Sequence, residues 1–273
     1  MCVVLHGPAP RTLLKRTTLS RAARRHTSTI GARAIIRDVA GRPSQGDDAP
    51  DRRTWLRERR AAVEAEYDAD AEAYDANPYP ARSHEAFVTR LLDSCPVGST
   101  VLDAPCGTGK YFEMVREAGR HVVGVDQSAG MLAQARARGI ADRLEQVGLQ
   151  ELSFDAEFDG VMTIDAMENV PTEDWPLVLG NLHRAVRSRG CLYLTVEEVG
   201  EVDIDAAFAD AQARRLPAVR GEIIEGDVAG YHFYPGREKV IRWLEAEGLD
   251  LVAEDFDQED GWGYRHLLVR SRR

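Results

Sequence analysis

The sequence of 273 residues lacks any apolar run near the roughly 20 residues that a membrane-spanning helix requires. It is also poor in cysteine, because its four cysteines lie far apart and form no C-x-x-C pair. This usage indicates neither a disulfide framework nor a cysteine zinc site, and it is typical of thiols in a reducing compartment. We therefore expect no membrane partner, and the chain is long enough to bury a core.

The first 37 residues contain no acidic side chain. Their eight basic residues are Arg11, Lys15, Arg16, Arg21, Arg24, Arg25, Arg33 and Arg37. A basic start that also carries Ser and Thr resembles a mitochondrial transit peptide. The favoured interpretation is a disordered extension and linker over residues 1–50, with "GRPSQGDDAPD" as the linker. The cytoplasm is thus the expected compartment, and the mitochondrial matrix is the alternative.

The rest of the chain lacks an excess of basic residues. Residues 38–273 hold 27 basic and 45 acidic side chains, a net charge of −18. Phosphate contacts need clustered Lys and Arg, so this acidic body argues against a nucleic-acid substrate.

Two helices are predicted before the main alternation of elements. "TWLRERRAAVEAEYDADAEAY" places Leu56, Val63, Tyr67 and Tyr74 on one helical face, and a second helix is predicted over His84–Leu92.

Short, strongly apolar segments then alternate with helical ones. Strands are predicted at residues 100–105, 121–126, 158–165 and 190–198. One of the helical segments carries an apolar stripe from Trp175 to Val186. This alternation predicts an α/β fold with a doubly wound parallel sheet that helices cover on both faces.

A glycine-containing turn, "VLDAPCGTGKYF", follows the first predicted strand. A phosphate-binding P-loop requires glycine where Ala104 stands and Ser or Thr where Tyr111 stands. A dinucleotide fingerprint requires glycine at Phe112, and Asp103 would repel a pyrophosphate. Neither pattern fits, and Lys110 is interpreted as a solvated residue of the following helix's first turn.

The same stretch resembles the first motif of class I S-adenosylmethionine-dependent methyltransferases. The resemblance implies that Asp103 lies near the cofactor's ammonium group and that Gly107 and Gly109 let the backbone approach the cofactor. Pro105 stands where the family usually has a further glycine. The family's fold is a Rossmann-like seven-stranded sheet, mostly parallel with an antiparallel last strand, here under an N-terminal helical cover.

"VVGVDQSAGML" resembles the second motif of this family. The resemblance implies that Asp126 accepts hydrogen bonds from both ribose hydroxyls, a role that suits the two oxygens of a carboxylate. Gln127 and Met131 are expected beside it at the cofactor.

The adenine side departs from the family's pattern. After the third strand, relatives often carry an acid for the adenine amino group, and Gly148 stands in its place. Adenine recognition is therefore expected from the backbone around Leu149 and from Gln150. Tyr74 resembles a residue that lies over the bound cofactor in relatives.

"FDGVMTIDAMENV" resembles the fourth motif and implies that Asp165 also lies at the cofactor. Some relatives bind a divalent ion here with acids and a histidine. Asn169 replaces that histidine, so no metal site is predicted. Glu168 is a candidate general base, although acids at this place also cap helices.

The C-terminal third is expected to hold the substrate. His232 lies in the aromatic stretch "GYHFYPG" and is a second candidate base, whereas His266 is expected to be structural. The segment between Glu198 and Gly230 is long, acidic and only partly periodic, which is typical of a functional loop. The predicted methyltransferase domain, 51–273, divides into N-terminal helices (51–95), a cofactor-binding core (96–198), a substrate lid (199–235) and a C-terminal helix with strands (236–273).

The resemblance predicts transfer of a methyl group from S-adenosylmethionine to a small-molecule acceptor by in-line displacement. The sequence does not choose between O-, N- and C-acceptors. Two alternatives stay open: a methyltransferase acting on protein or RNA, with the basic N-terminus as docking arm, and a non-catalytic S-adenosylmethionine-binding regulatory module.

Overall fold

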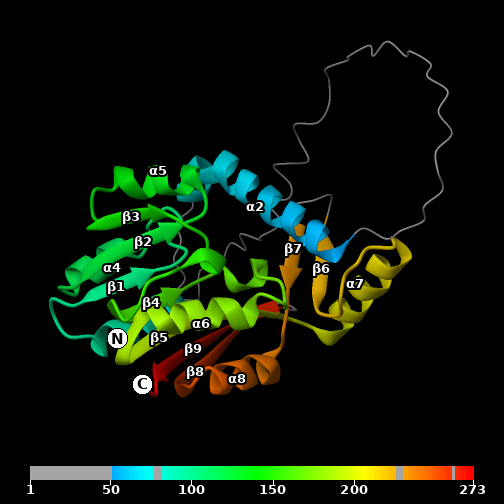
Figure 1. Ribbon diagram of the computed structural model, residues 1–273. Coiled ribbons are helices and arrows are strands. Elements are labelled where there is room, and N and C mark those ends of the chain that lie inside the picture. Colours follow the sequence, from blue (N-terminus) through cyan, green and yellow to red (C-terminus); the bar gives the residue numbers. More distant parts are fainter. Residues whose placement is uncertain (1–50, 77–81, 226–229, 260–261) are drawn as a thin grey trace, which may run out of the picture. The chain divides into compact units, whose positions relative to one another are not determined.

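In the computed structural model, which describes residues 51–76, 82–225, 230–259 and 262–273, a seven-stranded sheet has the order β3-β2-β1-β4-β5-β9-β8 (Figure 1). The strands are β1 (Thr100–Asp103), β2 (His121–Asp126), β3 (Arg143–Gln146), β4 (Phe158–Thr163), β5 (Val186–Val199), β8 (Leu249–Glu259) and β9 (Trp262–Ser271). Strands β1 to β5 pair in parallel, and β9 runs antiparallel to both β5 and β8. The predicted sheet, with its antiparallel last strand, is confirmed.

Helices cover both faces of this sheet. One face packs against α3 (Arg82–Asp93), α4 (Phe112–Glu117) and α5 (Ala129–Ala137), and the other packs against α6 (Trp175–Ala185) and α8 (Arg237–Ala246). Successive residues of a strand point to opposite faces, so Val101 and Leu102 of β1 enter different cores. This is the doubly wound arrangement that the sequence predicted.

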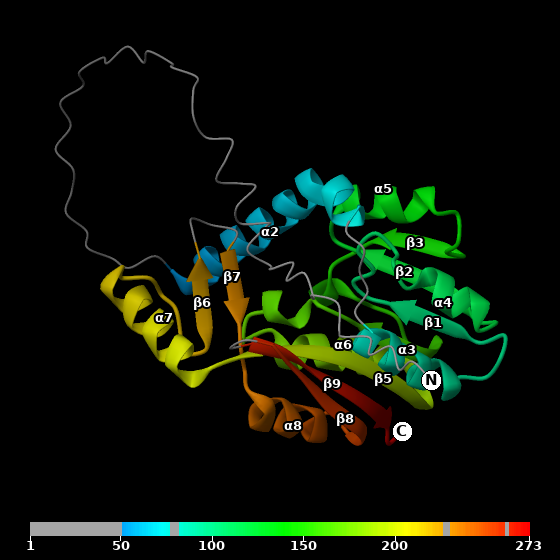
Figure 2. The same cartoon turned by 180° about the vertical axis from the view of Figure 1, so that it is seen from behind.

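The first predicted helix is α2 (Arg52–Asp75), and its start is set by a side-chain cap. Asp51 accepts a hydrogen bond at 3.0 Å from the backbone N–H of Thr54, one of the donors that a helix start leaves unpaired. Figures 1 and 2 both show α2 extending from the β6–β7 strands to α5, across the edge at which β1 and β2 end.

Contacts with the β2–α5 turn hold the middle of α2 against the sheet domain. Oδ1 of Asp68 accepts hydrogen bonds from Ser128 Oγ at 2.6 Å and from the N–H of Gly130 at 2.8 Å. A Cβ atom on Gly130 would lie 2.6 Å from the carbonyl oxygen of Asp68, so only glycine permits this close approach.

The predicted lid segment contains regular structure. It comprises α7 (Glu201–Ala213) and an antiparallel pair, β6 (Glu222–Glu225) and β7 (Gly230–Phe233). The two short strands were not predicted. Glu222 is fully buried and accepts hydrogen bonds from Arg52 Nη2 and the Tyr231 hydroxyl, each at 2.7 Å. These bonds tie the strand pair to α2; the role of the segment as a lid stays a prediction.

One predicted boundary was wrong. Val186 was placed on the helical stripe, but α6 ends at Ala185 and Val186 begins β5. Val186 is nevertheless buried in the core that α6 forms, which explains why it continues the apolar pattern. In the described ranges, every helix is too short or too polar to cross a membrane.

Candidate active site

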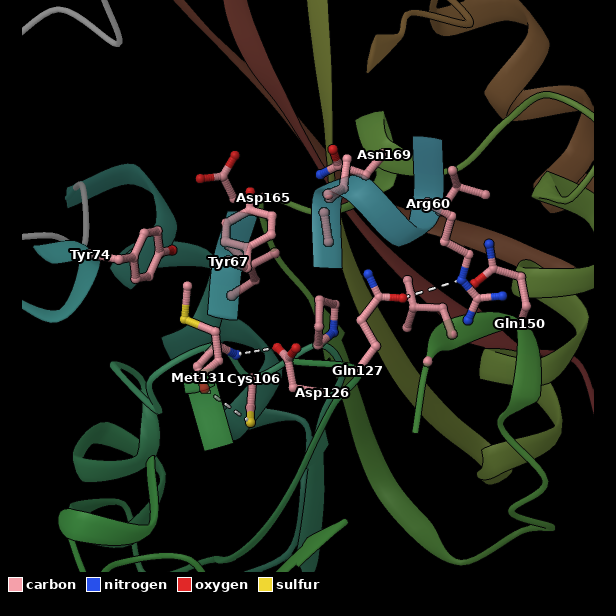
Figure 3. A pocket seen from close by; sticks show the side chains of 18 of the residues that line it. Arg60, Tyr67, Tyr74, Cys106, Asp126, Gln127, Met131, Gln150, Asp165 and Asn169 are labelled. Carbon is pink, nitrogen blue, oxygen red and sulfur yellow. Dashed lines mark hydrogen bonds between the residues drawn. The ribbon is translucent and has the colours of Figure 1, made fainter. Parts of the chain in front are cut away.

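A pocket lies at the carboxyl ends of β1, β2 and β4, and the space between its lining residues, open solvent included, is about 1010 Å³. Doubly wound sheets bind their ligands at this edge. Figure 3 shows Arg60, Gln127 and Gln150 at one end of the pocket, and Tyr74 and Asp165 at the other.

Eight of the ten residues predicted to bind the cofactor line this pocket. The first two motifs supply Gly107, Asp126, Gln127 and Met131. Other segments supply Tyr74, Leu149, Gln150 and Asp165. The two predicted residues outside the lining are Asp103 and Gly109.

Asp126 ends β2 and is 6% exposed. Its Oδ2 accepts a hydrogen bond from the N–H of Gly107 at 2.9 Å, and its Oδ1 accepts one from the N–H of Ser128 at 2.8 Å. Burial raises the pKa of this carboxyl to about 6, although the two backbone N–H groups favour the ionised form. The site thus holds a buried carboxylate at the pocket wall, fixed by the glycine turn.

Asp103 lies just behind this wall. It is 1% exposed, and burial together with the charge of Asp126 raises its pKa well above the usual range. Its Oδ2 has no hydrogen-bond partner within the described ranges. Contact with the cofactor's ammonium group therefore stays a prediction for Asp103.

Gly109 has a structural reason to be glycine. Its φ is +77°, and a Cβ atom there would lie 2.5 Å from the Phe112 ring. Phe112 stands where a dinucleotide fingerprint has its third glycine, and its ring fills the space above the turn. The glycine is thus explained by the turn and by Phe112, and its contact with the cofactor stays a prediction.

The interpretation of Lys110 as a solvated residue was wrong. Lys110 lines the pocket, and its Nζ donates a hydrogen bond at 2.8 Å to the carbonyl oxygen of Tyr74. The ammonium also lies 4.1 Å from the centre of the Tyr74 ring, and burial lowers its pKa. The end of α2 lies against the glycine turn, a tertiary contact that the motif itself does not contain.

The end of the pocket predicted to bind adenine contains an arginine that the motifs missed. Arg60 of α2 lines the pocket and forms an ion pair with Glu151 and a hydrogen bond with Gln127. The backbone around Leu149 was predicted to recognise adenine. Its carbonyl oxygens at Leu149 and Gln150 both accept hydrogen bonds at 3.0 Å from the buried Asn181 amide. The local sequence gives no signal for Arg60, which is one of several arginines on α2.

Asp165 has an unusual backbone conformation at the opposite end. Its φ is +54°, a left-handed value that costs a non-glycine residue roughly 1–3 kcal/mol and is typical of functional sites. The N–H of Asp165 donates to Thr195 Oγ1 at 2.7 Å, and the Tyr264 hydroxyl donates to its Oδ1. Two strands of the sheet, β5 and β9, thus fix this carboxylate at the pocket.

The two candidate bases do not line the pocket. Glu168 is 3% exposed in the turn η2 (Met167–Asn169), and His232 is half-buried on β7 with Nδ1 3.2 Å from the Tyr234 hydroxyl. His266 is buried with Nδ1 2.9 Å from the Tyr193 hydroxyl, as a structural histidine would be. Within the described ranges, no three His, Cys, Asp or Glu side chains are grouped to hold a metal ion.

Comparisons with solved structures show the same fold. The chain is similar to 1,6-didemethyltoxoflavin-N1-methyltransferase of Burkholderia thailandensis, with a TM-score of 0.60 and 16% identity over 88% of this chain and 94% of that chain. A S-adenosylmethionine-dependent methyltransferase of Methanosarcina mazei gives a TM-score of 0.56 and 15% identity over 66% and 95%. At these identities, the likeness concerns the fold alone.

Sequence comparisons reach further. Residues 101–190 match the model of a methyltransferase domain family. The malonyl-[acyl-carrier protein] O-methyltransferase of Pseudescherichia vulneris is 30% identical over 200 residues, which are 72% of this chain and 74% of that protein. The enzyme of the same name from Pectobacterium atrosepticum is 36% identical over 189 residues, 67% of this chain but 61% of that protein.

The chain therefore belongs to the S-adenosylmethionine-dependent methyltransferases. The predicted family, its fold and its cofactor are thereby confirmed. In six of the curated relatives, the match spans only 35–61% of the relative's own length.

Proposed function

We propose that this protein transfers the methyl group of S-adenosylmethionine to a small-molecule acceptor that enters the same pocket. The observation that supports this most directly is the convergence of eight predicted cofactor residues on one pocket at the carboxyl edge of the sheet.

The ribose end of the cofactor is assigned to Asp126. Backbone N–H groups hold both carboxylate oxygens in place, and each oxygen keeps a further lone pair for a ribose hydroxyl. Met131 and Leu149 are buried apolar residues of the lining, suited to the two faces of a planar base. The residues present therefore fit an adenosyl group.

The amino-acid end is assigned to the region of the glycine turn. Lys110 offers a half-buried ammonium that suits the carboxylate of the cofactor, and Asp165 offers a carboxylate that suits its amino group. Tyr74, in the last turn of α2, lies against the glycine turn and would cover this end.

When bound, S-adenosylmethionine supplies a methyl group already activated on a sulfonium sulfur. The protein then has to hold the acceptor in line with that carbon, and alignment alone lowers barriers by up to ~7–11 kcal/mol in ideal cases. A general base is needed only for a poorly ionised acceptor. Glu168 and His232 keep this role as proposals, although reaching the pocket would require a different arrangement of their segments.

The names of the relatives suggest a second class of acceptor. Malonyl-[acyl-carrier protein] O-methyltransferases act on a group attached to a carrier protein, and several of them match this chain. A carboxylate on such a carrier is thus the first protein-borne acceptor to test. The net charge of −18 for residues 38–273 disfavours RNA. The cytoplasm stays the predicted compartment.

The decisive experiment screens metabolite fractions, and separately acyl-carrier proteins loaded with short acids, with methyl-labelled S-adenosylmethionine. The proposal expects label in a small-molecule fraction together with stoichiometric S-adenosylhomocysteine. Label on the carrier alone would favour the second acceptor class. Tight cofactor binding without turnover on any fraction would favour the regulatory module and overturn the proposed activity.

A further inference from the structure

At the end of the pocket assigned to adenine, Arg60 bonds to two neighbouring side chains, although it belongs to none of the cofactor motifs (Figure 3). Its Nε donates a hydrogen bond at 3.2 Å to Oε1 of Gln127. Its Nη1 donates at 2.7 Å to Oε1 of Glu151, and Nη2 binds the other oxygen of the same carboxylate. The guanidinium is thus fixed in its plane by a two-point ion pair and a third bond to the amide.

This arrangement depends on the glycine at position 148. A Cβ atom there would overlap Nη2 of Arg60 and would lie 2.8 Å from Oε2 of Glu151. The same Cβ would lie 3.4 Å from Oε1 of Gln127. A larger residue at position 148 would therefore require the ends of the Arg60 and Glu151 side chains to shift.

The bond from Arg60 also decides how the Gln127 amide is oriented. A side-chain amide has one acceptor oxygen and one donor nitrogen, and either can face a ligand. Because Nε of Arg60 can only donate, it takes the oxygen of Gln127. The amide nitrogen is then the part of Gln127 that remains for a ligand, and Gln127 lines the pocket.

Gln127 directly follows Asp126, the residue assigned to the ribose diol. The base atoms nearest to the ribose include the ring nitrogen N3 of adenine, which is an acceptor. We propose that Arg60 is a positioning residue for base recognition: it fixes the Gln127 amide so that its Nε2 donates a hydrogen bond to N3 of adenine. The inference rests on the proposed function, because it requires that the pocket bind an adenosyl group.

A purely structural role for Arg60 is the competing explanation. Arg60 and Glu151 are 33% and 52% exposed in their side chains, and they join α2 to the turn η1 (Leu149–Glu151). Such a tie would affect the stability of α2 and the affinity for every ligand alike. A positioning role changes instead the discrimination between ligands that differ only at N3.

The test measures calorimetric affinities for S-adenosylhomocysteine, its 3-deaza analogue and its 7-deaza analogue. The proteins are the unaltered chain, Arg60→Met, and Arg53→Met as a matched control at an exposed position of the same helix. We expect the unaltered chain to bind the 3-deaza analogue roughly threefold to tenfold more weakly than S-adenosylhomocysteine, the effect of one hydrogen bond.

In Arg60→Met, this 3-deaza ratio should fall close to one, while the 7-deaza ratio stays as in the unaltered chain. Arg53→Met should keep both ratios. Gln127→Leu should lose the 3-deaza ratio in the same way, and the double variant should lose nothing further, because both changes remove one bond. Gln127→Leu also decides the question if Arg60→Met fails to fold.

Retention of the full 3-deaza ratio in Arg60→Met, or in Gln127→Leu, overturns the inference and leaves the proposed function intact. A 3-deaza ratio of one in the unaltered chain overturns it as well. Failure of the unaltered chain to bind S-adenosylhomocysteine at all would overturn the proposed function, and the inference with it.

Discussion

The two walls of the pocket are built in different ways. The sheet wall consists of the ends of β1, β2 and β4 with the turns that follow them, and it includes Gly107, Asp126 and Asp165. The helix wall consists of α2, which contributes Arg60, Tyr67 and Tyr74. Backbone N–H groups of the neighbouring turns fix Asp126 in the first wall, and side chains of β5 and β9 fix Asp165. Side-chain contacts between distant segments fix the second.

Besides the Arg60 and Lys110 contacts, the helix wall is held at other places along α2. Arg52 binds Glu222 of β6, Asp68 binds the β2–α5 turn, and Asp75 binds Arg138 after α5. Exposed ion pairs contribute about 0–1 kcal/mol each to stability. Loss of the partner of a buried carboxylate such as Glu222 destabilises the fold more, because a buried charge is left uncompensated. The sheet wall should therefore dominate cofactor affinity, and the helix wall should adjust selectivity.

The largest loss of cofactor affinity is expected from a substitution in the sheet wall. Asp126→Ala should weaken S-adenosylhomocysteine binding at least tenfold, because charge-assisted hydrogen bonds contribute ~1.5–3 kcal/mol each. Isothermal calorimetry measures this, with circular dichroism to check folding and Glu117→Ala, an exposed acid on α4, as control. Unchanged affinity in a folded Asp126→Ala protein would remove the ribose assignment and the comparison of the walls with it.

Cofactor affinity should also depend on pH through the Asp126 carboxyl. The unliganded Asp126 carboxyl has a pKa near 6, with Asp103 and Asp68 as its acidic neighbours. Diol binding uses the ionised form, so affinity should be full above pH 7 and should fall about tenfold by pH 5 as the carboxyl takes up a proton.

Calorimetry between pH 5 and pH 8 measures this dependence. The affinity of Asp126→Ala should be flat over the same range, which serves as the control. A similar acid-side loss in that variant would assign the titration to another group.

The sequence predicts the residues of the sheet wall better than those of the helix wall. Gly107, Asp126 and Gln127 were predicted from the resemblance to two family motifs, each of which is a short continuous stretch of chain that contains a strand end and the turn after it. Arg60 contacts Gln127 and Glu151 across 67 and 91 residues of chain, so no local pattern marks it.

The same reason applies to three further positions. Lys110 resembles a solvated residue until α2 packs beside it. Glu222 has the composition of a surface acid, yet it is buried because Arg52 and Tyr231 supply its partners. His232 was proposed as a base from its aromatic surroundings, but its strand pairs with β6 outside the pocket lining.

A moderate effect is expected at the junction of the two walls. Lys110→Met should weaken S-adenosylhomocysteine binding roughly threefold to tenfold, because one partly exposed charge pair with the ligand's carboxylate is lost. Binding of 5′-methylthioadenosine, which has no carboxylate, should change less than twofold. Equal losses for both ligands would show that Lys110 supports Tyr74 rather than the ligand.

The smallest effect is expected from removing residues 1–50. A chain beginning at Asp51 keeps the cap of α2 and the Arg52–Glu222 pair, so its melting temperature and its affinity for S-adenosylhomocysteine should match those of the full chain.

A chain beginning at Thr54 provides the contrast, because it loses the cap, which contributes about 1 kcal/mol, and leaves the buried Glu222 without Arg52. Its melting temperature should fall by several degrees, while its affinity should change little if the sheet wall dominates binding. Differential scanning calorimetry and titration on the three chains separate these outcomes. A drop of several degrees already at Asp51 would show that residues 1–50 contribute to the stability of the domain, and a tenfold affinity loss at Thr54 would show that the helix wall carries as much of the binding as the sheet wall.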